Sequence, residues 1–376
     1  MGFVKAMLQG ANSAKDYQVQ FGKNIDYVKE VLHPYLPAEW EPQAFIQLTW
    51  PHAHTDWAYM LEEVTACYLN IAREIVKRQT LLIVTPEPEH VKALLSANNI
   101  PAQDIVFFAC ETNDTWARDH GFVTMLDCRI PHLLDFQFNG WGLKFAANKD
   151  NQINARLYES GLIGGKYVDC RGFVLEGGSI ESDGNGTLLT TAECLLSPNR
   201  NNPLLTRADI EQFLTKTFNL QRILWLDHGY LEGDDTDSHI DTLARLCPDD
   251  TIVYVQCTDP QNAHYKELHL MEEQLQGFKT LEDKPYRLIP LPWPSPVYVD
   301  GERLPATYAN FLILNKAVLY PTYAQPDNDE AARKALQEAF PRREIVGIDC
   351  RALIRQHGSL HCVTMQYPLE VTLQKE

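Results

Sequence analysis

Several features that mark other classes of protein are missing from this sequence. No apolar run approaches the roughly 20 residues that a membrane-spanning helix needs. The N-terminus carries a lysine but no sustained apolar segment, so we expect no signal peptide. Neither a glycine-rich phosphate-binding loop nor a Ser- or Gly-rich linker is present. We therefore expect a cytoplasmic protein without a membrane partner.

The cysteines lack the arrangement of a disulfide framework. The chain has nine of them, an odd number, and no two form a Cys-x-x-Cys pair. Dispersed cysteines of this kind are typical of free thiols in a reducing cytosol.

Positive charge is scarce in this chain. Fifty acidic residues against 33 basic ones give a formal net charge of −17. Such a field repels nucleic acid and anionic lipid, and it favours the collection of small cations. The sequence therefore predicts no nucleic-acid partner and favours a small cationic substrate over a phosphorylated one.

Strand-like and helix-like segments alternate along the chain. Residues 61–78 place apolar side chains at helical spacing, and residues 81–84 form a short apolar run typical of a buried strand. Roughly five such mixed β/α units follow one another. Further strands are expected at 172–174, 179–182 and 187–191, joined as a meander, and at 308–314 and 360–365.

The chain reads as one domain with an extension. Residues 1–36 have little pattern beyond a helix near 24–32, so we interpret them as an N-terminal extension. The polar motifs span 116–362 without an intervening linker. We therefore predict a single catalytic α/β domain over 37–376.

Cys362 stands out among the cysteines because of its surroundings. Most single cysteines are small buried apolar residues, and that is the ordinary interpretation. Here a Gly-Ser loop leads into the expected strand 360–365, which would expose the thiol at a strand edge. His361 would then point to the opposite face, so it is not the obvious base. With histidine and carboxylates elsewhere in the chain, Cys362 suggests a thiolate hydrolase.

The segment 235–241 holds three carboxylates and one histidine in seven residues. It could be a solvated acidic turn, or Asp and His ligands for Zn²⁺ or Mn²⁺. No second histidine at hydrolase-like spacing supports the metal site. A third interpretation uses strand geometry, in which His239 and Asp241 project from one face into a pocket and transfer protons beside a bound cation.

Two other motifs carry carboxylates. In Trp-Ala-Arg-Asp (116–119), an Arg–Asp pair taken alone is usually a structural ion pair, with Trp116 and Arg118 on one side if the segment is extended. In Leu-Glu-Gly-Gly (175–178), Glu176 precedes two glycines that allow a turn or a close backbone approach.

Taken together, the motifs resemble one family. They occur in the family's order from about residue 37 to residue 368: Trp-Ala-Arg-Asp (116–119), Asn-Gly-Trp-Gly (139–142), Leu-Glu-Gly-Gly-Ser-Ile (175–180), Asp-Thr-Asp-Ser-His-Ile-Asp (235–241), Ala-Thr-Tyr-Ala-Asn-Phe (306–311) and His-Gly-Ser-Leu-His-Cys (357–362). The chain resembles the agmatine deiminase/Porphyromonas-type peptidyl-arginine deiminase family. The resemblance implies an α/β fold, the five-bladed pentein propeller of pseudo-repeated β/α units around a central active site.

The resemblance also implies roles for individual residues. Cys362 would be the nucleophile and His239 the general acid and base, with Glu176 supporting His239. Asp119 and Asp241 would bind the substrate's guanidinium group. Trp116 is a candidate wall for the substrate's aliphatic chain. No metal and no organic cofactor is expected.

The implied activity is hydrolysis of a C–N bond in a linear amidine. The first reading is agmatine deiminase, which forms N-carbamoylputrescine and ammonia on a route to putrescine. The alternative is a citrulline-forming deiminase of peptidyl or free arginine. A homodimer is the family-level expectation. A non-catalytic binding protein and a metal-dependent hydrolase are the rival classes.

This chain departs from the commoner family form at three places. His-Gly-Phe follows Asp119, Ser-Ile-Glu occupies 179–181, and Gln-His-Gly-Ser-Leu-His precedes Cys362. None of these changes removes a catalytic residue type. We expect them to reshape the pocket around the substrate's tail.

Overall fold

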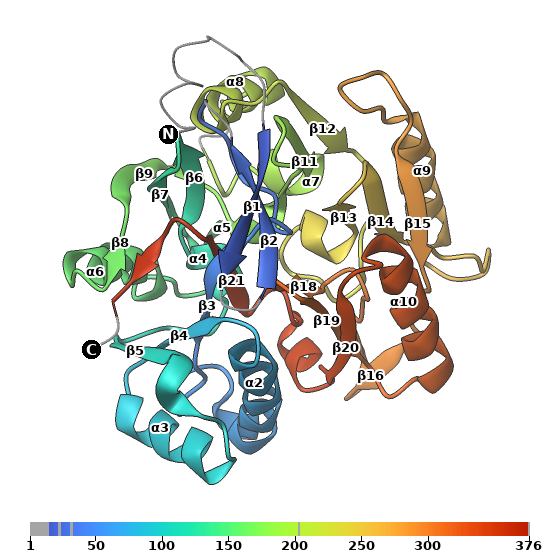
Figure 1. The fold of residues 1–376 in the computed structure, drawn as a ribbon. Helices are drawn as coiled ribbons and strands as arrows, with labels where there is room; N and C mark the ends of the chain where they lie inside the picture. Colours follow the sequence, from blue (N-terminus) through green and yellow to red (C-terminus); the bar gives the residue numbers. More distant parts are fainter. Residues whose placement is uncertain (1–14, 22–23, 31–32, 202–203, 375–376) are drawn as a thin grey trace, which may run out of the picture.

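The computed structural model describes residues 15–21, 24–30, 33–201 and 204–374 (Figure 1). Within them the strands form five sheets of three or four strands and three two-stranded pairs. The protein is therefore a mixed α/β structure in which no sheet closes on itself.

Four of the five sheets have three strands each and repeat one plan. The first two strands pair antiparallel, and the third joins the second in parallel. The four sheets are β6 (Val123–Asp127), β7 (Ile130–Gln137) and β9 (Lys166–Val174); β10 (Ile180–Ser182), β11 (Thr187–Thr191) and β12 (Arg222–Leu226); β13 (Ala244–Cys247), β14 (Thr251–Val255) and β15 (Arg287–Leu291); and β18 (Leu312–Ile313), β19 (Ala317–Thr322) and β20 (Glu344–Asp349).

The fifth sheet joins strands from residues 43–109 to a strand near the C-terminus. Its order is β21 (Thr364–Pro368), β3 (Gln43–Thr49), β4 (Thr80–Thr85) and β5 (Ile105–Ala109). Strand β21 runs antiparallel to β3, and the other neighbours are parallel. The C-terminal strand therefore completes a sheet that begins near residue 43.

Helices connect the parallel strands, as the geometry of a parallel pair requires. Several of them lie at the outside of the molecule, whereas the short helices α4 and α5 and strand β21 lie near its centre (Figure 1). The helices are α2 (Leu61–Val76), α3 (Pro88–Ala97), α4 (Ala117–His120), α5 (Gly140–Leu143), α6 (Ile153–Glu159), α7 (Ala192–Leu195), α8 (Arg207–Phe218), α9 (Tyr265–Gly277) and α10 (Pro326–Ala339).

Short 3₁₀ turns and two-stranded pairs complete the structure. The turns are η1 (Ala58–Met60), η2 (Ala102–Asp104), η3 (Asp150–Gln152), η4 (Gly177–Ser179), η5 (Ile240–Thr242) and η6 (Leu353–Gln356). The pairs are β1 (Lys15–Phe21) with β2 (Asn24–Glu30), β8 (Ile163–Gly164) with β22 (Thr372–Leu373), and β16 (Val297–Val299) with β17 (Glu302–Leu304).

The helices form where the sequence pattern places them. In α2, Val64, Ile71 and Ile75 lie on the buried face that packs against β4. Helix α8 begins at a capping box between Thr206 and Asp209, which satisfies the free N–H groups of its first turn. These local signals set the helix bounds within a few residues of those expected from sequence.

Other expectations from the sequence are wrong. The segment 24–30 is strand β2 of a hairpin rather than a helix, in keeping with its β-branched and aromatic residues, while 31–32 lie outside the described residues. The expected meander is split, because 172–174 end β9 and pair with β7 in another sheet. Of the strand expected at 308–314, only β18 (Leu312–Ile313) forms.

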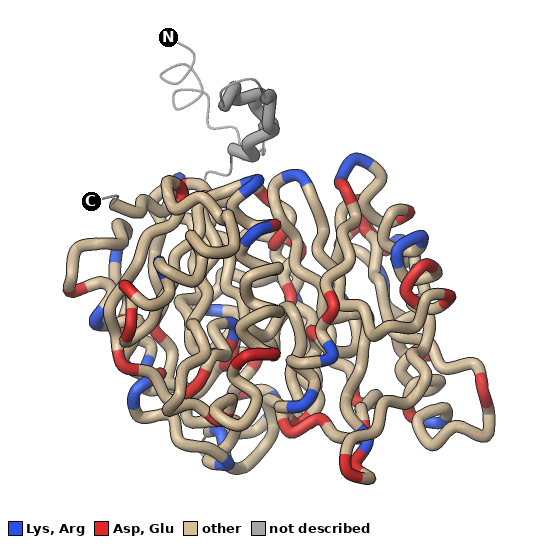
Figure 2. Tube along the Cα trace, turned by 90° about the horizontal axis from the view of Figure 1, so that it is seen from below, with Lys and Arg blue, Asp and Glu red and all other residues tan. Residues whose placement is uncertain are grey.

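The distribution of charged residues and the length of the apolar helices bear on possible contacts with a membrane. Acidic and basic positions are interspersed over the chain rather than separated onto two faces (Figure 2). Across the ranges that the structure describes, the helices are too short or too polar to cross a lipid bilayer.

Candidate active site

Five polar residues predicted from the sequence meet at the centre of the molecule, and all five are buried. Each lies in or next to a short element rather than inside a long one. They are Asp119 in α4, Glu176 just before η4, His239 and Asp241 around η5, and Cys362 two residues before β21.

Cys362 contacts two polar side chains. Its Sγ lies 3.9 Å from Asp241 Oδ2 and 3.4 Å from Asn310 Oδ1. Burial, followed by the negative charges of Asp241 and Asp119, raises the pKa of Cys362 well above its usual value. The thiol therefore stays protonated until a positive charge arrives beside it.

The expected position of Cys362 on a strand is wrong. Residues 360–363 form a turn, and β21 begins at residue 364. The turn is held because Asn310 Oδ1 accepts hydrogen bonds from the backbone N–H groups of His361 and Cys362, at 2.8 and 3.3 Å. Arg118 N–H also donates to the Cys362 carbonyl, at 3.1 Å.

His239 lies between two carboxylates. Its Nδ1 is 3.7 Å from Asp119 Oδ1, and its Nε2 is 3.6 Å from Glu176 Oε2. Burial alone would lower the pKa of His239, but the charge of Asp119 together with Cys194 and Glu176 raises it well above the usual value. His239 is therefore an imidazolium at neutral pH.

The expected strand geometry of His239 and Asp241 is also wrong. Residues 240–242 form the 3₁₀ turn η5, and Asp237 and Ser238 before it have φ of 61° and 60°. The two side chains nevertheless reach the same site, because the turn rather than a pleat directs them inward.

Asp119 is oriented by two donors. Trp141 Nε1 donates to Oδ2 and Gly178 N–H donates to Oδ1, both at 3.0 Å. Burial raises the pKa of Asp119 to about 6, although His239 acts in the opposite direction. The segment is the helical turn α4 rather than extended, so the expected alternation of Trp116 and Arg118 with Asp119 does not apply.

Close packing explains the second of the two glycines that follow Glu176, Gly178. A Cβ at this position would lie 2.6 Å from His239 Nδ1 and 2.8 Å from Asp119 Oδ1. It would also lie 3.2 Å from Asp241 Oδ2. Only a glycine allows the backbone to approach these three side chains so closely.

Glu176 is held by an arginine. Arg200 Nε donates to both carboxylate oxygens, at 3.1 and 2.8 Å, and both side chains are fully buried. Burial would raise the pKa of Glu176, but His239 and Arg200 lower it below its usual value. Glu176 therefore faces His239 as a carboxylate.

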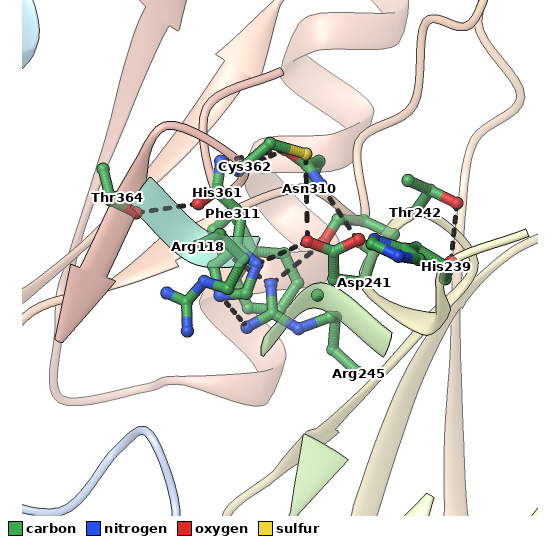
Figure 3. Close-up of polar contacts among 12 residues, drawn as sticks. Arg118, His239, Asp241, Thr242, Arg245, Asn310, Phe311, His361, Cys362 and Thr364 are labelled. Carbon is green, nitrogen blue, oxygen red and sulfur yellow. Dashed lines mark hydrogen bonds and ion pairs between the residues drawn. The ribbon is translucent and has the colours of Figure 1, made fainter. Parts of the chain in front are cut away.

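A charged chain of residues lies behind Asp241 (Figure 3). His361 Nδ1 is 2.8 Å from Asp241 Oδ2, and its Nε2 is 2.8 Å from Glu39 Oε2. Arg245 donates to Glu39 at 2.6 Å and pairs with Glu181. His361 is therefore not on the face opposite Cys362, since both residues contact the same oxygen of Asp241.

A pocket of about 20 Å³ opens beside Cys362 and Asp119. Its walls are aromatic and acidic, with no lysine or arginine among the residues that line it: Asp56, Asp114, Trp116, Asp119, Trp141, Phe145, Asp235, Thr236, Gln356, His357, Gly358 and Cys362. Trp116 is thus placed in the pocket wall. A larger cavity of about 70 Å³ lies elsewhere and contains none of the residues predicted for the reaction.

Three carboxylates besides Asp119 line the pocket: Asp56, Asp114 and Asp235. Burial, with the charge of Asp150, raises the pKa of Asp114 to about 8. Burial and the charge of Asp234 raise the pKa of Asp235 to about 6. A cation that enters the pocket would therefore draw these carboxyl groups toward their charged form.

Residues 35–368 match the model of the Porphyromonas-type peptidyl-arginine deiminase family. The chain belongs to this family. It is 32% identical over 361 residues to the agmatine deiminase of Pseudomonas fluorescens, covering 89% of this chain and 95% of that protein.

Two solved structures of the family are similar throughout. A Porphyromonas gingivalis protein provisionally named an arginine deiminase is 49% identical, with a TM-score of 0.85 over 91% of this chain and all of the other. The C. jejuni agmatine deiminase with substrate bound is 38% identical, with a TM-score of 0.81 over 89% of this chain and 96% of the other.

Several residues of the site were not predicted from the sequence. Trp141 and Asn310 lie inside motifs that carried the family resemblance, so the sequence marked both positions but assigned neither residue a role. The supporting residues Glu39, Arg200 and Arg245 carry no local signal, because each acts on a partner far away in the chain.

Proposed function

We propose that this chain hydrolyses agmatine to N-carbamoylputrescine and ammonia, with Cys362 as nucleophile. The observation that carries the proposal is a buried cluster of one thiol, one imidazolium and three carboxylates, of which Cys362 and Asp119 line a pocket that has no lysine or arginine in its walls. Such a site suits a planar cation that must be attacked at carbon. The names of the related proteins point to the same chemistry.

Asp119 and Asp241 hold the guanidinium. Asp119 lines the pocket and Asp241 lies 3.9 Å from the Cys362 sulfur, so charge-assisted hydrogen bonds from guanidinium N–H groups to both carboxylates would fix the guanidinium plane. Asp241 Oδ1 has no hydrogen-bond partner among the described residues, so it is available to the substrate. The arriving cation also lowers the pKa of the Cys362 thiol, whose proton leaves to solvent.

The first half-reaction is attack by sulfur. The Cys362 thiolate adds to the guanidinium carbon and forms a tetrahedral adduct. The imidazolium of His239 gives its proton to the departing nitrogen, and ammonia leaves. A C–S bond has replaced a C–N bond, which leaves an S-alkyl thiouronium on Cys362.

The second half-reaction is hydrolysis. Neutral His239 takes a proton from water, and the hydroxide adds to the thiouronium carbon. The adduct breaks its C–S bond to expel the Cys362 thiolate, and its hydroxyl proton leaves to solvent, which gives the neutral ureido group of the product. Glu176, fixed by Arg200, keeps the imidazole oriented and favours its protonated form through the cycle.

The pocket favours agmatine over free arginine. Agmatine has only an amine at the end where arginine also carries a carboxylate, and the pocket walls include Asp56, Asp114 and Asp235. A carboxylate would be repelled there. Trp116 forms part of the wall along the aliphatic chain, with its Nε1 donating to Asp114 at 3.0 Å.

The test is an assay of ureido product with three substrates: agmatine, arginine and a blocked peptidyl arginine. We expect the highest kcat/KM for agmatine and no turnover by Cys362→Ser. A higher kcat/KM for peptidyl arginine would instead support the alternative that the family description names. Turnover retained by the serine variant would exclude the covalent route.

We also propose that the five sheets are the blades of a propeller whose centre is the site. The repeated strand plan and the pairing of β21 with β3 support this arrangement. Residues 37–376 would then be one catalytic domain and residues 1–36 an extension.

A further inference from the structure

A second thiol lies beside His239 that the reaction does not use. Cys194, in α7, is fully buried, and its Sγ is 3.9 Å from Glu176 Oε2. One ligand atom each from Cys194, Glu176 and His239 lie within 4.8 Å of one another. Sulfur, imidazole nitrogen and carboxylate oxygen are the donors that Zn²⁺ takes in proteins.

His239 leaves both of its ring nitrogens open. The side chain is fully buried, yet neither nitrogen has a hydrogen-bond partner within the described chain. Buried polar groups normally have such a partner. The Nε2 atom faces Glu176 Oε2 at 3.6 Å, a separation too long for a hydrogen bond.

The measured separations are close to those of a metal site. Zn–N and Zn–O bonds of about 2.0 Å and a Zn–S bond of about 2.3 Å place tetrahedral neighbours roughly 3.3 to 3.6 Å apart. The Nε2 to Oε2 and Sγ to Oε2 distances are 3.6 and 3.9 Å. These two distances therefore need to close by only a few tenths of an ångström, and the third, between the thiol and the imidazole, is at most 4.8 Å.

The surrounding charge also admits a cation. Asp119 lies 3.7 Å from the other nitrogen of His239, and Asp237 neutralises part of Arg200. Arg200 takes only part of the capacity of Glu176, because a carboxylate offers about four lone-pair sites. It would orient the ligand, as supporting residues around metal ligands commonly do.

A second cluster of possible metal ligands differs from this one because an arginine occupies it. Glu39, Glu181 and His361 also bring three donor atoms together. The guanidinium of Arg245 bonds to both of these carboxylates and lies 3.1 Å from His361 Nε2. Arg245 therefore fills the place that a metal ion would take.

We propose that Glu176, Cys194 and His239 form a binding site for a soft divalent cation such as Zn²⁺, which inhibits the enzyme. The ion gains bonds to Oε2, Sγ and Nε2, while the thiol proton and the Nε2 proton leave to solvent. No oxidation state changes. The cluster lies next to the pocket, because Asp119 lines the pocket and is 3.7 Å from His239 Nδ1.

The experiment uses Co²⁺ as a spectroscopic probe and Zn²⁺ for affinity, with full-length protein first dialysed against EDTA. We expect wild type and Cys362→Ser to bind one Co²⁺ with a sulfur-to-cobalt charge-transfer band. Cys194→Ser should lose the band, and its Zn²⁺ affinity should fall at least about 10-fold. Cys247→Ser, another buried cysteine, is the matched control and should behave as wild type.

Two outcomes would overturn the site. One is a band that survives in Cys194→Ser but disappears in Cys362→Ser, because the metal would then sit on the nucleophile. The other is the absence of saturable binding in wild type. If Cys194→Ser does not fold, the fallback variants are Glu176→Gln and His239→Asn, each combined with Cys362→Ser. Each should weaken Zn²⁺ binding, and unchanged affinity in either would contradict the proposal.

Inhibition rests on the proposed function, but binding does not. Zn²⁺ should reduce agmatine turnover by wild type, EDTA should restore it, and Cys194→Ser should need more Zn²⁺ for the same loss. Because binding is measured without substrate, failure of the metal site is distinguishable from failure of the proposed activity.

Discussion

At the scale of single residues, the charges of the site lie in two layers. Cys362 and Asp119 line the pocket and would meet substrate. Behind them His361 and Glu39 form a chain of short contacts that ends on Arg245. The inner residues His361 and Glu39 therefore orient Asp241, which contacts both His361 and the nucleophile.

Replacing His361 should impair catalysis without removing a predicted catalytic group. The change His361→Phe deletes the donor 2.8 Å from Asp241 and leaves that buried carboxylate without its closest partner. A hydrogen bond to a charged group contributes about 1.5 to 3 kcal/mol, so kcat/KM should fall roughly 10- to 100-fold. Glu39→Gln, one contact further from Asp241, is the control and should fall less. An unchanged kcat/KM in His361→Phe would contradict the two-layer description.

Asp114 should make agmatine binding depend on pH. Its pKa of about 8 lies above that of an ordinary carboxyl, so the group is neutral at pH 7 and ionises as pH rises through 8. We expect KM for agmatine to fall between pH 7 and 9 in wild type. The part of this fall that comes from ionisation of Asp114 should be absent in Asp114→Asn. KM measured across that range tests it. A wild-type to variant KM ratio that is constant with pH would be inconsistent with the prediction.

Asp114 should also make folding stability depend on pH. A rise in pH should strengthen agmatine binding but lower the stability of the fold. Because the folded state holds the Asp114 proton up to about pH 8, whereas the unfolded chain releases it near pH 4, folding stability from this group falls as pH rises through that window. Thermal unfolding of Asp114→Asn should therefore show a weaker loss of Tm between pH 5 and 8 than wild type.

At the scale of elements, short turns rather than long strands carry the site. Asp119 is in α4, His239 and Asp241 flank the start of η5, and Cys362 is in the turn before β21. Turns bring side chains closer than a pleated strand can, since they do not have to alternate between two faces. The close approach of η4 to these side chains depends on Gly178.

Gly178→Ala should disable the enzyme through geometry alone. The added methyl group would displace His239 and Asp119, from which it would lie 2.6 and 2.8 Å. A displacement of about 1 Å at a reacting centre can cost on the order of 100-fold in rate, so we expect at least that loss in kcat. Gly172→Ala is the matched control, because a Cβ there meets nothing within 4 Å. Equal activity of the two variants would show that the backbone approach at Gly178 does not matter.

At the scale of the whole molecule, the sheet of β21, β3, β4 and β5 holds the strand that follows the nucleophile. Tyr367 of β21 is fully buried, stacks on Phe45 of β3 with ring centroids 4.4 Å apart, and donates to Gln47 Oε1 at 2.7 Å. Cys362 lies five residues before this contact. Packing between β21 and β3 therefore fixes the strand that follows the turn of Cys362.

Shortening Tyr367 should destabilise the whole fold. By analogy with other large aromatic residues in cores, Tyr367→Ala should cost about 3 to 5 kcal/mol of unfolding free energy. Tyr367→Phe should cost about 1 to 3 kcal/mol, because it leaves Gln47 Oε1 without its donor. Denaturant unfolding of both variants gives the values. Equal costs would mean that the ring contributes nothing beyond the hydrogen bond.

The sequence determined the elements whose signals are local. The bounds of α2 follow from its apolar spacing, and motifs in family order identified the family and the residues that meet at the site. Only the tertiary structure decided which sheet a strand joins, as for residues 172–174, and which partners hold the site. Glu39 meets His361, and Arg200 meets Glu176, across long stretches of chain. A buried charge depends on whichever groups surround it in space, and no local pattern in the sequence records those groups.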